Sequence, residues 1–174
     1  GVGIKAVNAL SIFFEIQAWR DGETKSIEFS KGEVVDEMKK PRKDDGVNGT
    51  RIAFDIDRTI FPQRTKYRER FVEKMCRYYS YLNPGLCIVY NGKKFKSKHG
   101  LLDLLKEEIE EEMLYDPITL AGPDIDISFT STTSSSEDYY TFVNGQHTTQ
   151  GGTHLNAFRE AIVKTVREFY NKNY

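Results

Sequence analysis

Tyr140–Tyr170 reads YTFVNGQHTTQGGTHLNAFREAIVKTVREFY, and this stretch decides how the C-terminal part of the chain folds. It overlaps a strand-like run of aromatic and β-branched residues, Tyr139–Val143. A polar turn at Asn144–Gln146 and a loop with the pair Gly151-Gly152 follow. From Thr153 onward the apolar residues take helical spacing and share one face: Leu155, Phe158, Ile162, Val166 and Phe169. The stretch therefore predicts a strand, a loop and an amphipathic helix.

The glycine pair leaves two interpretations of the loop open. Glycines directly before a helix leave its first N–H groups sterically accessible, so an anionic or carbonyl group could dock there. The same residues also suit a tight structural turn. On the residues alone, the loop is either a structural turn or a contact surface.

The C-terminal stretch resembles a known family. Thr149–His154, TQGGTH, followed by a helix that ends Arg167-Glu168-Phe169-Tyr170, resembles the second domain of the ATP-operated B subunit of bacterial type II DNA topoisomerases, DNA gyrase and topoisomerase IV. Gln150 and the Arg167–Phe169 ending resemble topoisomerase IV more than gyrase.

Three further landmarks of the family occur in the same order along the chain. The N-terminal GVG with VNALS resembles the end of the family's ATP lid and the helix after it. The other two are Gly49–Phe54, GTRIAF, and Leu82–Gly85, LNPG. The four landmarks extend over nearly the whole chain. Because the chain begins with Gly1 inside one of them, we expect it to be a fragment.

The resemblance implies an α+β fold in two parts. Residues 1–100 would be the C-terminal part of a GHKL ATPase domain, a mostly antiparallel sheet with helices. Residues 101–174 would be the N-terminal half of the transducer domain, which has a split βαβ fold. The resemblance also implies a role in coupling ATP binding and hydrolysis to DNA strand passage, and hence an ATP-hydrolysing isomerase in the full subunit.

Two sets of site residues are expected, the first from the resemblance and the second from the glycines and polar side chains beside the last helix. The resemblance implies that Gly1, Val2, Gly3 and Ile4 line the phosphates of the nucleotide, and glycines at a helix N-terminus suit that role. By itself a Gly-x-Gly pair is weak evidence for such a contact, and an ordinary turn into a helix is the simpler explanation. We interpret the loop before the last helix as an interdomain or transmission surface: Gln150, Gly151, Gly152, Thr153 and His154.

The family's general-base glutamate and its magnesium-binding residues precede the lid, so no catalytic residue is assigned to this chain. ATP and Mg²⁺ are expected in the full subunit and no cofactor on this chain alone, which we expect to be inactive by itself. The implied partners are DNA, the topoisomerase A subunit and a second B subunit. No membrane is implied, and the implied location is the bacterial cytoplasm.

Other chemistry is weakly indicated. Asp55 and Asp57 alternate along a predicted strand, which predicts that both face solvent. His147 and His154 flank the glycine loop without a cysteine partner, so no metal site is predicted. His154 is expected to make hydrogen bonds in the first turn of the helix. None of the GxxxxGK[ST], G-x-S-x-G or H-E-x-x-H motifs occurs.

Charge keeps two rival functions open. The chain has 25 Lys and Arg against 26 Asp and Glu, which argues against a dedicated, strongly basic nucleic-acid binder. The basic residues nevertheless form three clusters: 39–43, 64–70 and 93–98. Solvated surfaces are the simplest explanation. A non-catalytic DNA-binding module and an interdomain scaffold remain alternatives.

Periodicity and turn signals predict the remaining elements. Helices are expected at 1–10, 67–81 and 101–113, the second packed through Phe71, Met75, Tyr78 and Leu82. Asp124–Thr130 is expected to pair with Tyr139–Val143 across the serine- and threonine-rich segment 131–136. Strands are also expected at 12–20, 24–29, 33–36, 49–56, 86–90 and 95–98. Cys76 and Cys87 are expected to be buried free thiols.

Overall fold

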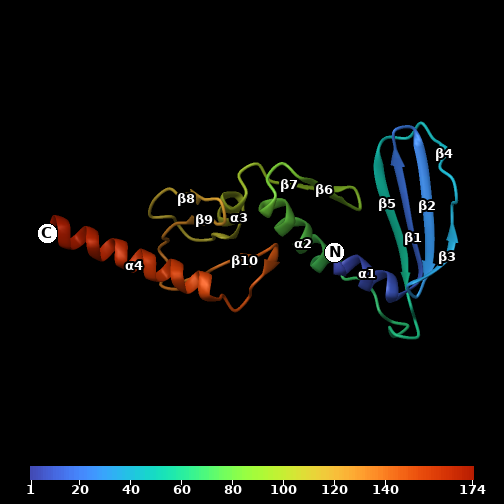
Figure 1. Ribbon diagram of the computed structural model, residues 1–174. Helices are drawn as coiled ribbons and strands as arrows, with labels where there is room; N and C mark the ends of the chain where they lie inside the picture. The colour runs from blue at the N-terminus through green and yellow to red at the C-terminus, as the bar shows by residue number, and fades with distance from the viewer. The chain divides into compact units, whose positions relative to one another are not determined.

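The computed structural model describes residues 1–174, which form two compact units, Gly1–Lys66 (unit 1) and Tyr67–Tyr174 (unit 2) (Figure 1). Both units mix helices with antiparallel strands, which confirms the predicted α+β class. The predicted boundary near residue 100 concerns the domains of the family and stays a prediction. No helix combines the length and the apolar character that crossing a membrane requires.

Unit 1 is a short helix followed by an antiparallel sheet in the order β3-β2-β1-β5, with β4 paired to β2. The hairpin between β1 and β2 turns at Asp21-Gly22, where both residues have positive φ, as a type I′ turn requires. The elements are α1 (Val2–Ala9), β1 (Ser11–Arg20), β2 (Glu23–Ser30), β3 (Glu33–Glu37), β4 (Arg42–Lys43) and β5 (Gly49–Ile56). The strands predicted from alternation in this unit are therefore confirmed.

Phe14 is the centre of packing in unit 1. Its side chain is 1% exposed, and its ring lies 6.0 Å from that of Phe29 and 6.4 Å from that of Phe54. Phe14 pairs with Phe29 on β2 and with Phe54 on β5, so the three rings come from adjacent strands at one level of the sheet. Cross-strand aromatic contacts of this kind stabilise the register of a sheet.

Asp57 is buried, which corrects the prediction that both Asp55 and Asp57 face solvent. Asp55 is exposed, but Asp57 is 1% exposed. Its carboxylate accepts hydrogen bonds from Thr59 N (2.9 Å) and Thr59 Oγ1 (2.7 Å), and Lys31 Nζ lies 3.0 Å away. Alternation fails here because the strand ends at Ile56 and the chain turns at Asp57.

Unit 2 contains three helices and three two-stranded pairings. Its elements are α2 (Glu69–Leu82), β6 (Cys87–Tyr90), β7 (Lys93–Lys96), α3 (Leu101–Glu108), β8 (Ile118–Ala121), β9 (Asp126–Phe129), β10 (Phe142–Val143), β11 (Gln146–His147) and α4 (Thr153–Asn173). The predicted hairpin turn at Asn91-Gly92 joins β6 to β7.

The core of unit 2 lies between α2 and α3. Tyr78, Tyr81 and Leu104 are buried together, and Leu101 and Phe142 pack against them. The predicted packing face of α2 is only partly confirmed, because Phe71 is 52% and Met75 is 42% exposed. The two cysteines are free, as predicted, but Cys76 is only half-buried and Cys87, at the start of β6, is exposed.

Helix α3 is shorter than predicted, ending at Glu108 instead of Met113. Its start is fixed by Asp103, which accepts hydrogen bonds from Ser97 Oγ (2.6 Å) and from the backbone N–H groups of Lys98 and His99. Its end falls within a run of glutamates, and negative charge at a helix C-terminus is unfavourable because it meets the negative end of the helix dipole.

The predicted partner of the strand at Asp124–Thr130 is wrong. β9 pairs with the preceding β8, in the register Ile118↔Phe129 to Ala121↔Asp126. Within Tyr139–Val143, only Phe142 and Val143 form a strand, β10, and it pairs with β11. Local alternation located strand β9 but contains no information about which neighbour it joins.

The predicted apolar stripe of α4 is buried only at its beginning. Leu155 is 7% exposed, and Phe158 lies edge-to-face on Phe129 with ring centroids 5.3 Å apart. Val166 and Phe169 are 62% and 65% exposed. The C-terminal half of the helix extends beyond the rest of unit 2 (Figure 1).

Candidate functional sites and family

The first candidate site is the N-terminal turn of α1. Gly1 is the residue before the helix, and no side chain caps the first turn. A Cβ added at Gly1 or at Gly3 would meet no atom within 4 Å. The first N–H groups of a helix have no partner within the helix, and they lie at the positive end of its dipole. Gly1, Val2, Gly3 and Ile4 thus form one exposed turn that a phosphate group could approach closely.

The second candidate site is the loop before α4, in unit 2. Gly151 has φ +73° and Gly152 has φ +150°, backbone conformations that residues with a Cβ atom rarely adopt. Gly151 N donates a hydrogen bond to Thr148 O (2.9 Å), and Asn156 N donates one to Gly152 O (3.2 Å). The glycines therefore form a tight turn that joins β11 to the helix.

Side chains on both sides hold this turn in place. Thr148 N and Thr148 Oγ1 both donate hydrogen bonds to Thr141 O, at 2.8 Å and 3.0 Å. His154 Nε2 lies 3.4 Å from Thr148 Oγ1, which confirms the expected hydrogen-bonding role of His154 in the first turn. Gln150 and Thr153 are exposed. The loop is thus ordered by threonine contacts, and polar side chains cover its outer side.

His147 belongs to the packing of unit 2. Its ring lies 5.2 Å from the ring of Tyr78 and 5.2 Å from that of Phe142. Desolvation, with a contribution from the charge of Lys74, lowers the pKa of His147. A neutral imidazole packed between aromatic rings has a structural role here. Nowhere in the described chain do three His, Cys, Asp or Glu side chains gather in a way that could hold a metal ion.

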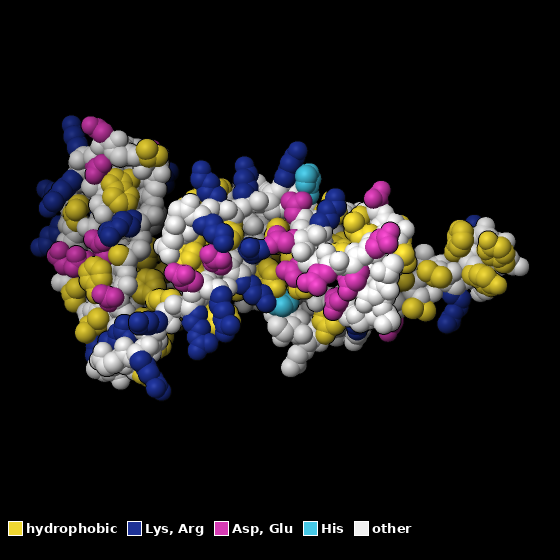
Figure 2. Space-filling view, turned by 180° about the vertical axis from the view of Figure 1, so that it is seen from behind, with side chains coloured by type: hydrophobic (Ala, Val, Ile, Leu, Met, Phe, Trp, Pro, Cys, Tyr) yellow, Lys and Arg dark blue, Asp and Glu magenta, His cyan; other side chains and the backbone are white.

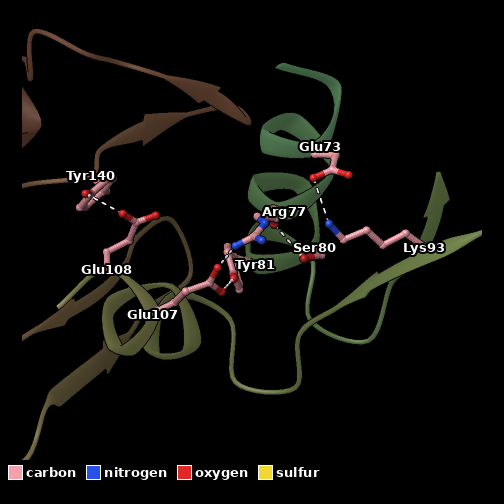
Figure 3. A network of polar contacts seen from close by, with 8 residues as sticks. All are labelled: Glu73, Arg77, Ser80, Tyr81, Lys93, Glu107, Glu108 and Tyr140. Carbon is pink, nitrogen blue, oxygen red and sulfur yellow. Dashed lines mark hydrogen bonds and ion pairs between the residues drawn. The ribbon is translucent and has the colours of Figure 1, made fainter. Parts of the chain in front are cut away.

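A polar network that the sequence did not predict links α2, α3, β7 and Tyr140 (Figure 3). Arg77 and the Tyr81 hydroxyl both donate to the carboxylate of Glu107, and Lys93 Nζ lies 3.0 Å from Glu73. Tyr140 donates to Glu108 at 2.9 Å; desolvation, followed by this hydrogen bond, raises the pKa of Tyr140 to about 12. The residues are scattered between 73 and 140, so spacing alone contained no signal.

Comparison with known proteins matches the chain along its whole length. The family model described as DNA gyrase B matches residues 93–174. The curated B subunit of DNA topoisomerase 4 from Borreliella burgdorferi is 41% identical over 177 residues, which include 100% of this chain and 29% of that protein. The B subunit of DNA gyrase from Streptococcus pyogenes is 30% identical, over 99% of this chain and 29% of that protein. The chain belongs to the family of type II topoisomerase B subunits.

Solved structures agree with the fold. The 43K ATPase domain of Thermus thermophilus gyrase B, in complex with an aminocoumarin, superposes with a TM-score of 0.81 at 30% identity, over 99% of this chain and 50% of that one. The topoisomerase IV ATP-binding domain of Francisella tularensis, with a TM-score of 0.75 at 24% identity, supports the fold alone. The chain spans about a third of the length of the curated relatives and half of these solved domains.

Proposed function

We propose that the chain is part of the ATP-operated subunit of a type II DNA topoisomerase, which couples ATP binding and hydrolysis to DNA strand passage. The observation that carries the proposal is the match to B subunits from end to end at 41% and 30% identity. The higher of these identities is to a topoisomerase IV protein. Together with Gln150 and the Arg167–Phe169 ending, this favours the topoisomerase IV type.

In the complete subunit, Gly1, Val2, Gly3 and Ile4 would contact the phosphates of ATP. The exposed first turn of α1 fits a phosphate group, because its N–H groups are uncapped and no Cβ stands at Gly1 or Gly3. Bound ATP with Mg²⁺ supplies the free energy that drives the cycle. The role of this chain is to bind and orient the phosphates at α1.

The loop Gln150, Gly151, Gly152, Thr153 and His154 would transmit the nucleotide state to the rest of the enzyme. Transmission requires that the loop contact different partners, or the same partner with different affinity, in two conformations. The support for this role is the combination of a tightly held glycine turn with exposed polar side chains. The partners in this function would be DNA, the A subunit and a second B subunit, in the cytoplasm of a bacterium.

The test is ATP turnover and DNA strand passage by the complete subunit assembled with its A subunit. Gly3→Ala is the informative variant. Alanine stabilises an exposed helix position by about 1 kcal/mol over glycine, so the fold is preserved or strengthened. Its methyl group would nevertheless stand where the phosphates approach. We expect a higher KM for ATP and slower strand passage than in the unaltered enzyme.

Ala6→Gly is the matched control, because it makes the opposite change in the same helix away from the first turn. We expect it to lower the stability of α1 and to leave the KM for ATP unchanged. An assembled enzyme without ATP-dependent strand passage would contradict the proposed function and favour a scaffold or DNA-binding module.

A further inference from the structure

Two adjoining cavities open on the surface of unit 2 on either side of Arg77 and Tyr81. One has a volume of about 330 Å³ and the other about 230 Å³. The first is lined mainly by α2, and the second mainly by β7. Since Arg77 and Tyr81 line both, the two cavities form one continuous hollowed surface, which we call the α2–β7 surface.

The α2–β7 surface is basic, although the chain as a whole is not. Six Lys and Arg side chains line it against three glutamates, whereas the whole chain has 25 basic and 26 acidic residues. The basic residues are Arg70, Lys74, Arg77, Lys93, Lys94 and Lys96. Figure 2 shows Lys and Arg side chains gathered over this part of unit 2.

Contacts within the protein neutralise only part of this charge. Lys93 is paired with Glu73, and Arg77 with Glu107 (Figure 3). The other four basic residues have no carboxylate within 4.0 Å and are exposed: Arg70, Lys74, Lys94 and Lys96. Glu108 is the one lining carboxylate without a basic partner, and it accepts the hydrogen bond of Tyr140.

The unpaired charges are arranged in rows. Arg70 and Lys74 are four residues apart on α2, so they lie on one helix face, which they share with Arg77, the residue paired with Glu107. Lys94 and Lys96 lie on the same side of β7, while Phe95 between them is buried on the other side. Their cross-strand neighbours on β6 are Val89 and Cys87, which offer no countercharge. Rows of like charge without a countercharge in the protein are complementary to an extended polyanion.

We propose that the α2–β7 surface binds the sugar-phosphate backbone of duplex DNA. This deepens the proposed function, on which it rests, by giving the DNA a contact on this chain. Three of the four aromatic residues that line the surface are buried: Tyr78, Tyr81 and Phe95, at 5%, 8% and 6% exposed. Tyr140 is 37% exposed and its hydroxyl is bonded to Glu108, so the surface has no row of open aromatic faces on which successive unpaired bases could stack. Cations spread over a helix and a strand contact phosphates along a duplex instead.

The experiment measures binding of a fluorescent DNA duplex to the complete subunit at several salt concentrations. Lys94→Ala combined with Lys96→Ala removes two unpaired charges. Each phosphate contact contributes about 0.9 to the slope of log K against log salt, so the double variant should reduce the slope by about 2. Lys39→Ala combined with Lys40→Ala removes two exposed lysines from a loop of unit 1 and serves as the control, whose slope should be unchanged.

Equal slopes for the two double variants and the unaltered subunit would overturn the inference. Displacement of the duplex by millimolar inorganic phosphate at constant ionic strength would also overturn it, because a small-anion site would then explain the charge. ATP turnover without DNA, measured on the same samples, separates the two claims. If ATP is turned over but the double variant leaves the salt slope unchanged, only the DNA contact is rejected. If the double variant reduces the salt slope but ATP is not turned over, only the proposed ATP-driven function is rejected.

Discussion

At the scale of single residues, two fully buried side chains stabilise the fold of unit 1 in different ways. Phe14 joins three strands through its ring contacts with Phe29 and Phe54. Asp57 ties the turn after β5 to Thr59 and to Lys31, which follows β2. The apolar contact supplies packing, and the charged contact fixes the position of a turn. Both can be followed by the fluorescence of Trp19, the only tryptophan of the chain.

Phe14→Ala should strongly destabilise unit 1. Truncating a buried phenylalanine costs about 3–5 kcal/mol through lost transfer free energy and the cavity left behind. Urea unfolding monitored by Trp19 fluorescence measures the change. Phe13→Ala is the control, because Phe13 is the neighbouring residue and is 38% exposed. Equal losses for the two variants would contradict the assignment of Phe14 as the centre of packing.

Asp57 should make unit 1 sensitive to acid. The hydrogen bonds from Thr59 and the ion pair with Lys31 lower the pKa of Asp57 to about 2 in the folded protein, from an ordinary value of 3.8. A lowered folded-state pKa contributes stability that is fully present above the ordinary pKa and is lost as pH falls toward 2. The urea midpoint from Trp19 fluorescence should therefore fall between about pH 4 and pH 2.

Asp57→Asn should remove this part of the acid dependence and lower the midpoint at neutral pH. Asp55→Asn, at an exposed position of β5 two residues earlier, should leave both unchanged. If the Asp57 variant retained the full acid dependence, another carboxylate would be responsible.

At the scale of elements, the segment formed by the β10–β11 hairpin, the glycine loop and α4 shows how conformation and space together select glycine. Gly151 has a positive φ, and a Cβ placed there would lie 2.9 Å from Leu155 Cδ2, in the first turn of the helix. Gly145 has a similar φ, but a Cβ there would lie at an ordinary 3.6 Å from the ring of Tyr79. A substitution at Gly145 therefore measures the free-energy cost of the backbone conformation, and one at Gly151 adds the cost of the close contact.

Gly145→Ala should lower the free energy of unfolding by about 1–2 kcal/mol, the cost of a left-handed backbone for a residue with a Cβ. Gly151→Ala should cost more, because the buried side chain of Leu155 must also move. Thermal unfolding followed by far-UV circular dichroism measures both changes. Equal costs would show that Leu155 adjusts freely and that only the backbone conformation requires glycine at position 151.

The sequence was sufficient for most elements but not for their partners. Alternation and turn residues located β1, β2 and β5, and the Asn91-Gly92 signal located the β6–β7 hairpin. The same signals assigned β9 to the wrong partner, because pairing depends on contacts that alternation does not encode. Asp57 was assigned to the surface because the alternation was extended one residue beyond the end of β5, where the chain turns and alternation no longer decides which side chains are buried. The polar network around Arg77 could not be predicted, since its members are brought together by packing of α2 against α3.

At the scale of the whole molecule, the two sites of the proposed ATP-driven cycle lie in different units. The first turn of α1 lies in unit 1, and the loop before α4 lies in unit 2. The proposed function requires that nucleotide binding at the first site change the contacts of the second. The strength of this link is a coupling free energy between the two sites. It can be followed by comparing ATP turnover with and without DNA.

Gly152→Ala tests the coupling in the complete enzyme. A Cβ there would lie 2.9 Å from His154 Cε1, so the His154 side chain must move away from Thr148. We expect DNA-stimulated ATP turnover and strand passage to decrease several-fold while ATP turnover without DNA stays unchanged. Unchanged stimulation would show that the loop is a structural turn only.

The most direct test of the central claim is calorimetric titration of a non-hydrolysable ATP analogue into residues 1–174 and into the complete subunit. We predict binding to the complete subunit and none to residues 1–174 alone, because the exposed turn Gly1–Ile4 offers contacts to the phosphates only. Gly3→Ala in the complete subunit should weaken the binding. If the complete subunit did not bind the analogue, the assignment of Gly1–Ile4 to the ATP lid would be wrong.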